Sequence, residues 1–396
     1  MSTSSPSQPI SLTFKRFFAS SKSSGIILTV CTVLSLLLAN SPASDAYLSF
    51  WYQRVAGMSI EHLINDGLMA VFFLLVGLEL ERELYNGELS DWRNALLPII
   101  AAVGGICIPA LLHFGLNAGT ATQSGIGIPM ATDIAFALGV LALLGSRIPA
   151  SLKIFLTALA VIDDLAAIVV IALFYTGDFR FDYFMGALIV FSVLVCLNRF
   201  ARVMALAPYL VGGVLMWVLM LMSGIHATIA GVLLAFAIPY SARQDDEESP
   251  SHRLEHLLHK PTAFIILPLF ALANTGIVIG SGWTAELASV NSLGIFAGLL
   301  LGKPAGIFLF SFAAVAFGVC KLPLTLSWRH VFGAGLLGGI GFTMSIFIAN
   351  LAFPGHPDTV TSAKITILLA SLTAGLLGFI WLKLIGQPLS SNIDPA

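Results

Sequence analysis

The feature that most constrains this chain is a succession of apolar stretches, each long enough to cross a lipid bilayer. A transmembrane helix needs roughly 20 mainly apolar residues, and twelve such segments lie between charges and turn signals. They are 22–40, 60–84, 94–116, 125–144, 151–175, 182–199, 206–222, 224–240, 260–280, 291–313, 329–350 and 361–384. Only 10% of the residues are charged, against about 25% in soluble domains. The sequence therefore predicts an all-α membrane protein with twelve transmembrane helices.

The distribution of Lys and Arg tests this number of helices independently, because cytoplasmic loops carry an excess of these residues. With a cytoplasmic N-terminus and alternating helices, only Arg54, Arg180 and Lys364 face outside, and Lys303 lies within the tenth span. The other fifteen of the nineteen Lys and Arg residues are then cytoplasmic. This predicts a multi-pass protein with both termini in the cytoplasm. Its parts are a tail over 1–21, a single transmembrane domain over 22–384 and a second tail over 385–396.

Composition gives no sign of other binding functions. The net charge of −2 gives no reason to expect a nucleic-acid partner. The four cysteines stand singly in apolar runs, so they indicate neither a disulfide framework nor a zinc site. We expect membrane lipid as the surroundings of the chain and no cofactor.

Four ionisable residues interrupt otherwise apolar spans. They are Asp133 in the fourth, Asp163 and Asp164 in the fifth, and Lys303 in the tenth. Each costs about 2.5–3.5 kcal/mol at the centre of a transmembrane helix on insertion scales, so they must face one another or a water-filled cavity. A structural salt bridge would use Lys303 and one acid but leave two carboxylates unexplained. Three acids against one base make a negative site, which suits a cation.

Asp163 and Asp164 are adjacent, so on a helix they point about 100° apart. Two carboxylates this close in a low dielectric cannot both ionise easily. Such a pair can hold protons or a small hard cation, but not comfortably both. Competition between H⁺ and a metal cation for the same oxygens is the chemistry of an exchanger.

Two spans carry residues that interrupt a helix. Pro129 precedes Thr132 and Asp133 in the fourth span, and the eleventh has five glycines in the nine residues from Gly333 to Gly341. Glycine also marks close helix packing in membranes, which is the simpler interpretation of the eleventh span alone. The interrupted spans are, however, the middle members of helices 3–5 and 10–12, two triplets that begin on opposite sides of the membrane. We interpret them as inverted repeats whose discontinuous helices 4 and 11 cross at the midplane.

At such a crossing the ends of the broken helices expose backbone dipoles. An acid such as Asp133 would offset exposed helix N-termini, and Lys303 would offset exposed C-termini.

Several stretches closely resemble the NhaA family of bacterial Na⁺/H⁺ antiporters, over nearly the whole chain. The matching segments are Asn65–Glu79, Ala131–Gly139, Ile162–Leu165, Ser223–Thr228, Gly302–Pro304 and Gly339–Phe347. NhaA is itself one of the transporters from which inverted repeats are known, so the fold argument and the resemblance are not independent. The resemblance implies an electrogenic, pH-regulated antiporter of the inner membrane. It would extrude Na⁺ and Li⁺ in exchange for external H⁺, and the two carboxylates suggest two H⁺ per Na⁺.

The resemblance also assigns roles to the buried charges. It implies that Asp163 and Asp164 alternately bind Na⁺ (or Li⁺) and protons. Lys303 would pair with Asp163 in one state, and Asp133 and Thr132 would lie where the broken helices cross.

Further residues match family positions linked to the pH response, and these are Glu79, Glu83, Glu255 and His256. Taken alone, each is also what a solvated loop charge looks like. The pair Glu81-Arg82 replaces the family's usual Lys-Arg, and the run 245–248 (DDEE) adds negative charge. Both departures would shift the activating pH.

The outer side of the molecule carries three more expectations from the resemblance. A homodimer would form through a β-hairpin in the first external loop, within Leu48–Ile60 and around Ala56-Gly57. Asp66 lies near the outer end of the second span, where it caps the helix, snorkels toward the interface or lines an external funnel. His226 matches a family position but is as well explained by a structural role.

Two functions of other classes stay open on the sequence alone. His252, Glu255 and His256 fit H-x-x-E-H, a zinc-hydrolase motif, but they fall in a short charged loop and leave the intramembrane acids unexplained. A sodium-coupled symporter of an organic solute would also use broken helices and buried acids. We expect a secondary transporter rather than an enzyme.

Overall fold

The computed structural model describes residues 12–55, 57–87, 89–177, 179–241, 249–280 and 283–386. Of residues 12–22 and Ala285 it describes the backbone only. The acidic run 245–248, Ala56 of the expected hairpin, and residues 1–11 and 387–396 of the expected tails lie outside the described residues.

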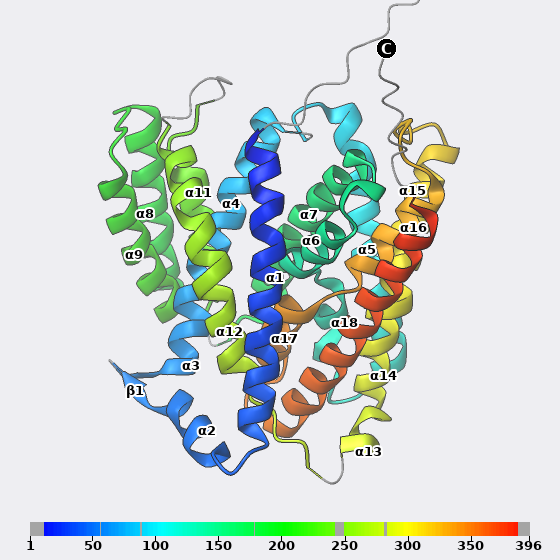
Figure 1. Ribbon diagram of the computed structural model, residues 1–396. Coiled ribbons are helices and arrows are strands. Elements are labelled where there is room, and N and C mark those ends of the chain that lie inside the picture. Colours follow the sequence, from blue (N-terminus) through cyan, green and yellow to red (C-terminus); the bar gives the residue numbers. More distant parts are fainter. Residues whose placement is uncertain are drawn as a thin grey trace, which may run out of the picture.

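The described chain is mainly helical, and most helices run side by side between two ends of a bundle (Figure 1). The first half comprises α1 Leu12–Ala39, α2 Ser44–Tyr52, β1 Arg54–Val55, β2 Met58–Ser59, α3 Ile60–His62, η1 Leu63–Leu68, α4 Met69–Asn86, α5 Trp92–Asn117, η2 Gln123–Met130, α6 Ile134–Leu143, η3 Gly145–Arg147, α7 Ala150–Phe174 and α8 Phe181–Arg199. The second half comprises α9 Leu206–Ser223, α10 Ile229–Ala237, α11 Pro250–Pro261, η4 Thr262–Ile266, α12 Leu267–Asn274, α13 Trp283–Leu287, α14 Val290–Ala297, η5 Gly298–Gly302, α15 Lys303–Ala316, α16 Trp328–Gly338, α17 Phe342–Ala352 and α18 Pro357–Ile385. Three of the η segments are π-helical, η1, η4 and η5.

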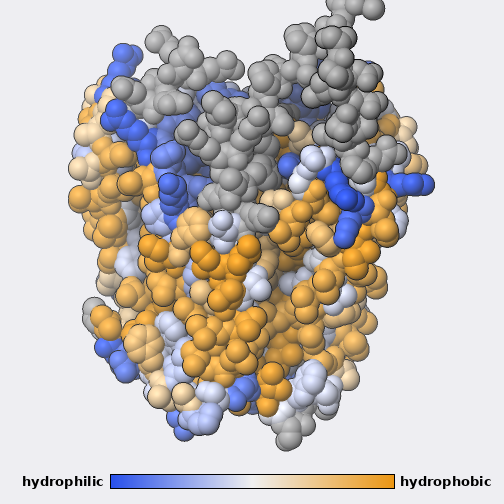
Figure 2. Space-filling model, viewed as in Figure 1, coloured by the Kyte–Doolittle hydropathy of each residue, from blue (hydrophilic) through white to orange (hydrophobic). Residues whose placement is uncertain are grey.

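The length and composition of these helices fit a bilayer. Within the described ranges nine helices are long and apolar enough to cross a membrane, or up to eleven if each of two bent pairs is one span. The bent pairs are α1 with α2, at 114°, and α16 with α17, at 47°. Figure 2 shows hydrophobic side chains around the middle of the visible face and hydrophilic ones toward its ends. The prediction of a helical multi-pass membrane protein is confirmed.

Two of the expected spans have other boundaries. The segment 224–240 holds only α10, nine residues long. Gly224 ends α9 in the left-handed region at φ 80°, and Pro239 forces the preceding residue out of the helical region. The segment 260–280 is helical from Pro250 to Asn274, because Ser249 caps the first turn and Pro250 is suited to the first helical position.

The chain ends and the loop expected to be the first external one also differ in part. Helix α1 begins at Leu12, inside the segment expected to be a tail. The expected hairpin is present, with β1 and β2 antiparallel and Arg54 opposite Ser59. Residues 48–52 of that loop are helical instead, because they belong to α2.

Close backbone contacts surround the span that carries Lys303. A side chain on Gly104 of α5 would collide with the carbonyl oxygen of Gly306 of α15, and the reverse also holds. A side chain on Gly339 would collide with the carbonyl oxygen of Leu299. The glycines of 333–341 therefore serve close packing, and the α16–α17 break falls among them at 339–341.

Candidate functional site

The site is built where two interrupted segments touch. Residues 131–133 between η2 and α6 are not helical, and 339–341 between α16 and α17 are not either. The Asp133 N–H donates to the Ile340 carbonyl oxygen at 2.6 Å. Pro129 and the glycines therefore mark real breaks, and the two breaks meet.

Asp133 caps two helices at once. Its Oδ1 accepts the Phe136 N–H of α6 at 3.0 Å. Its Oδ2 accepts the Thr343 N–H of α17 at 3.0 Å and also the Thr343 hydroxyl. Helix N-termini present unsatisfied N–H groups and favour a negative charge. Asp133 thus lies where the sequence argument expects it, at exposed helix N-termini.

Hydroxyl groups, rather than Lys303, contact the carbonyl ends of the broken helices. Thr132 Oγ1 lies 2.9 Å from the Gly338 carbonyl oxygen, and Ser345 donates to the Ile128 carbonyl oxygen at 2.7 Å. Lys303 was expected to offset these carbonyl ends. Its hydrogen bond goes to the Asp163 carboxylate instead, so no contact supports that expectation. Thr343 and Ser345 were missed as site residues, although both follow directly after the glycine-rich stretch that marked the break.

Asp163 is the acid that Lys303 meets. Lys303 Nζ donates to Asp163 Oδ2, in a salt bridge with both side chains fully buried. Thr132 Oγ1 lies 2.8 Å from the same oxygen. Since a hydroxyl has one proton, Thr132 can serve Asp163 or the Gly338 carbonyl, but not both at once.

Asp164 lies beside this pair on α7, and both aspartates are 1% exposed. Oδ1 of Asp163 and Oδ1 of Asp164 accept no hydrogen bond from any residue that the structure describes. Buried carboxylate oxygens are nearly always partnered. Two oxygens without a partner on adjacent acids, near a single ammonium, form a place where protons or a small cation would compensate charge.

Comparison with known proteins finds relatives over nearly the whole chain. The sequence model of a family described as "Na+/H+ antiporter 1" matches residues 15–382. The chain belongs to the NhaA family. It is 68% identical to "Na(+)/H(+) antiporter NhaA" of Dechloromonas aromatica, with 96% of this chain and 97% of the relative covered. The relative from Cytophaga hutchinsonii is 55% identical (96% and 97%), and that from Vibrio alginolyticus 50% (92% and 95%).

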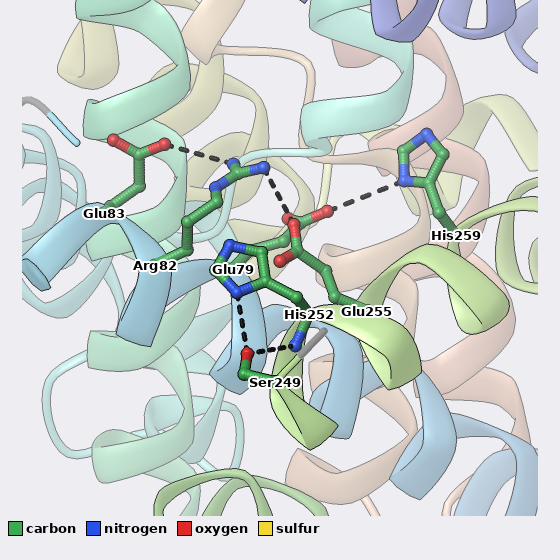
Figure 3. Close-up of polar contacts among 7 residues, drawn as sticks. All are labelled: Glu79, Arg82, Glu83, Ser249, His252, Glu255 and His259. Carbon is green, nitrogen blue, oxygen red and sulfur yellow. Dashed lines mark hydrogen bonds and ion pairs between the residues drawn. The ribbon is translucent and has the colours of Figure 1, made fainter. Parts of the chain in front are cut away.

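A second group of charges lies at one end of the bundle, where α4 meets α11 (Figure 3). Arg82 donates to Glu255 at 2.8 Å and to Glu83 at 3.1 Å. His259 Nδ1 lies 3.7 Å from Glu79 Oε1. Three of the four residues proposed for the pH response, Glu79, Glu83 and Glu255, thus share one cluster with Arg82 and His259.

His256, the fourth of these residues, is exposed. It lies one residue after Glu255 on α11, so it points about 100° away. His259, one turn after Glu255, takes the place in the cluster that the sequence argument gave to His256. The i, i+4 spacing could have identified it, had the segment been expected to be helical.

The H-x-x-E-H stretch is helical, so its assignment to a loop was wrong. His252 lies in the first turn of α11 and His256 in the second. His252 contacts Ser249 Oγ at 2.9 Å, and Glu255 is bound to Arg82. Among the described residues, no group of three or more His, Cys, Asp or Glu side chains has an arrangement that could hold a metal ion.

Glu81, which stands where the family usually has Lys, faces α11 as well. It is 6% exposed and accepts a hydrogen bond from Ser251 at 3.2 Å. Nearby, Tyr240 stacks on Tyr85 and on His252. These ring contacts connect the end of α4 to the start of α11.

The last two predicted residues lie elsewhere. Asp66 is buried in η1 and contacts His62 Nε2 at 3.0 Å. His226 Nε2 lies 2.7 Å from the Tyr175 carbonyl oxygen. Neither residue contacts Asp163 or Asp164. The His226 hydrogen bond connects the segment after α9 to the C-terminal end of α7.

Proposed function

We propose that this chain is a Na⁺/H⁺ antiporter in which Na⁺ and H⁺ compete for Asp163 and Asp164. The observation that carries the proposal is the pair of buried carboxylate oxygens, one on each aspartate, that no described group partners. With one ammonium nearby, only one of the two charges is compensated. Either protons or a cation must supply the rest, and a site that accepts both in turn couples their movements.

Lys303 provides the coupling to Asp163. An ammonium paired with a buried carboxylate stabilises it, and breaking such a pair costs about 3–5 kcal/mol if one charge is left alone. Na⁺ at Asp163 removes the need for Lys303, so cation and ammonium exchange places. Thr132 follows the change, since its hydroxyl can turn from Asp163 to the Gly338 carbonyl.

The fold proposed for this chemistry has twelve spans. The described helices supply up to eleven by length and composition, and α10 with its irregular flanks would be the twelfth. Helices 3–5 and 10–12 form inverted repeats, with η2–α6 and α16–α17 as the discontinuous spans that cross at the midplane. Asp133 and Thr132 hold the crossing, and alternating access moves it as a unit.

The remaining features of the proposal concern the protein in its membrane. The domain over 22–384 lies in the inner membrane of a bacterium, with both tails (1–21 and 385–396) cytoplasmic. Li⁺ is also carried, two H⁺ enter per Na⁺, and no resident cofactor takes part. The β1–β2 hairpin pairs with that of a second copy. The α4–α11 cluster sets the pH response, and Asp66 and His226 contribute to an external funnel and its wall.

The test is Na⁺-driven proton flux in everted membrane vesicles. A preformed pH gradient should collapse on addition of Na⁺ or Li⁺, and Asp164→Asn should reduce the rate at least about 100-fold, because one exchanging carboxylate is lost. Gel filtration and membrane yield check that the variant is folded. Absence of Na⁺-dependent flux from the folded, unaltered protein up to about pH 9, or full activity of Asp164→Asn, would contradict the proposal. Na⁺ entry that requires an organic solute would indicate symport instead.

A further inference from the structure

A cavity opens at the end of the bundle opposite the α4–α11 cluster. It has a volume of about 430 Å³ and is lined by α2, the 273–277 segment and the turn before α18. Helix α2 and β1 lie at the end of the molecule away from the end of α18 (Figure 1). With both termini cytoplasmic, as proposed, this cavity faces outside.

Three asparagine side chains line the cavity, each from a different element. Asn65 of η1 and Asn274 of α12 exchange hydrogen bonds, at 2.7 Å from Asn274 Nδ2 and 3.3 Å from Asn65 Nδ2. Asn350 of α17 donates to Asn274 Oδ1 at 2.7 Å. Asn274 is 1% exposed, so the amides join three helices across the inner side of the cavity.

The same helices supply an aromatic layer that is fully buried. Phe347 of α17 packs on Phe73 of α4 and on Phe270 of α12, with ring centroids 5.8 and 6.4 Å apart. Phe270 precedes Asn274 by one helical turn, and Phe347 precedes Asn350 by about one turn. The amide layer therefore lies toward the cavity, and the phenyl layer lies deeper.

Helix α17 connects both layers to the carboxylate site. Thr343, Phe347 and Asn350 have the i, i+4, i+7 spacing of one helix face. Thr343 is bonded to Asp133 at the break. The two layers thus stand on the face of α17 that leads from the cavity to the crossing.

We infer that Asn65, Asn274 and Asn350 form the outer gate of the cation pathway, where Na⁺ exchanges hydration water for amide oxygens. The inference rests on the proposed antiport. The three amides would bind a hydrated monovalent cation transiently. When the amides are paired with one another, the phenyl layer beneath them closes the path.

The chemistry of the amide suits this task. Carbonyl oxygens can replace the hydration shell of a cation, and conduction requires binding that is weak enough to release it. A carboxylate at the gate would hold Na⁺, and an apolar ring alone would have to be rewetted at each opening. Amides released from one another are rehydrated at small net cost, because their hydrogen bonds are exchanged for bonds to water.

The experiment compares the two faces of the membrane. Asn350→Asp adds a charge at the gate, so the apparent KM for Na⁺ applied to the outer face should fall about fivefold, which equals about 1 kcal/mol, the attraction of two unit charges about 4 Å apart in water. Right-side-out proteoliposomes give this value, and everted ones give the KM at the cytoplasmic face, which should stay within about twofold. The maximal rate should fall because Na⁺ leaves the gate more slowly.

Asn350→Ser, which adds no charge, is the matched control and should lower KM on neither face. If Asn350→Asp is not recovered as folded protein, Asn65→Asp repeats the test. Asn65 is chosen because its side chain is less buried than that of Asn274. Equal KM changes on both faces, or no change in either aspartate variant, would overturn the gate. KM can be measured only if the protein exchanges Na⁺ for H⁺. Failure of the gate is therefore distinguishable from failure of the proposed antiport, in which the unaltered protein shows no flux.

Discussion

Within the described residues, two groups of acids and bases are built in opposite ways. Around Asp163 and Asp164 the side chains are fully buried, the single cation is Lys303, and two carboxylate oxygens have no described partner. At the α4–α11 cluster, Arg82 bridges two acids and its side chain is 34% exposed. The group around Asp163 and Asp164 is buried and has more negative than positive charge. The α4–α11 cluster is partly exposed, and ion pairs join its members.

This difference matches the separate roles proposed for the two groups, transport for the first and pH response for the second. A buried, under-compensated pair must take up cations or protons, because the alternative is an uncompensated charge in a low dielectric. A partly exposed cluster is screened by water and salt, so each charge is worth less and responds gradually to pH. Three substitutions test how far this contrast holds.

The largest effect should follow from breaking the buried pair. Lys303→Met leaves Asp163 buried without its cation and should destabilise the protein by about 3–5 kcal/mol. The double variant Asp163→Asn/Lys303→Met removes both charges and should recover most of that loss. Thermal unfolding of the purified proteins in one detergent measures both. If the double variant is as unstable as Lys303→Met, the loss does not come from the uncompensated charge of Asp163.

A smaller effect is expected at the double cap of the crossing. Thr343→Val removes the hydroxyl bond to Asp133 with little change in volume and should cost about 1.5–3 kcal/mol, the range for hydrogen bonds to charged groups. Thr366→Val is the matched control, since the buried Thr366 hydroxyl bonds only to the carbonyl one turn back in its own helix, α18. Equal losses of thermal stability in both variants would argue against a special role of the cap.

The smallest effect on stability should come from the partly exposed α4–α11 cluster. Arg82→Gln removes the cation between Glu255 and Glu83 and should cost about 1 kcal/mol or less. The carboxylates are then harder to ionise together, so the pH profile of exchange should move toward alkaline pH by about half a unit, and less at high salt. His256→Gln, outside the cluster, should leave the profile in place. A shift with His256→Gln and none with Arg82→Gln would reverse the assignment.

Much of the class and of the central site could be predicted from the sequence. A charge in an apolar run is visible in the sequence because its insertion cost is large and local, so Asp133, Asp163, Asp164 and Lys303 were found without a structure. Pro129 and the clustered glycines marked the breaks for the same local reason. The bounds of α10 and α11 were missed, since a polar first turn and an irregular flank carry little hydropathy signal.

The partners of these residues were decided by tertiary structure alone. Lys303 meets Asp163 across 140 positions of sequence, and Thr343 meets Asp133 across 210. No periodicity relates positions so far apart, so the sequence could name the charges but not pair them. The same holds for His259 in place of His256, and for the three asparagines that meet at the cavity beside α2. Insertion cost is a property of each residue in its own helix, whereas pairing depends on how the helices pack.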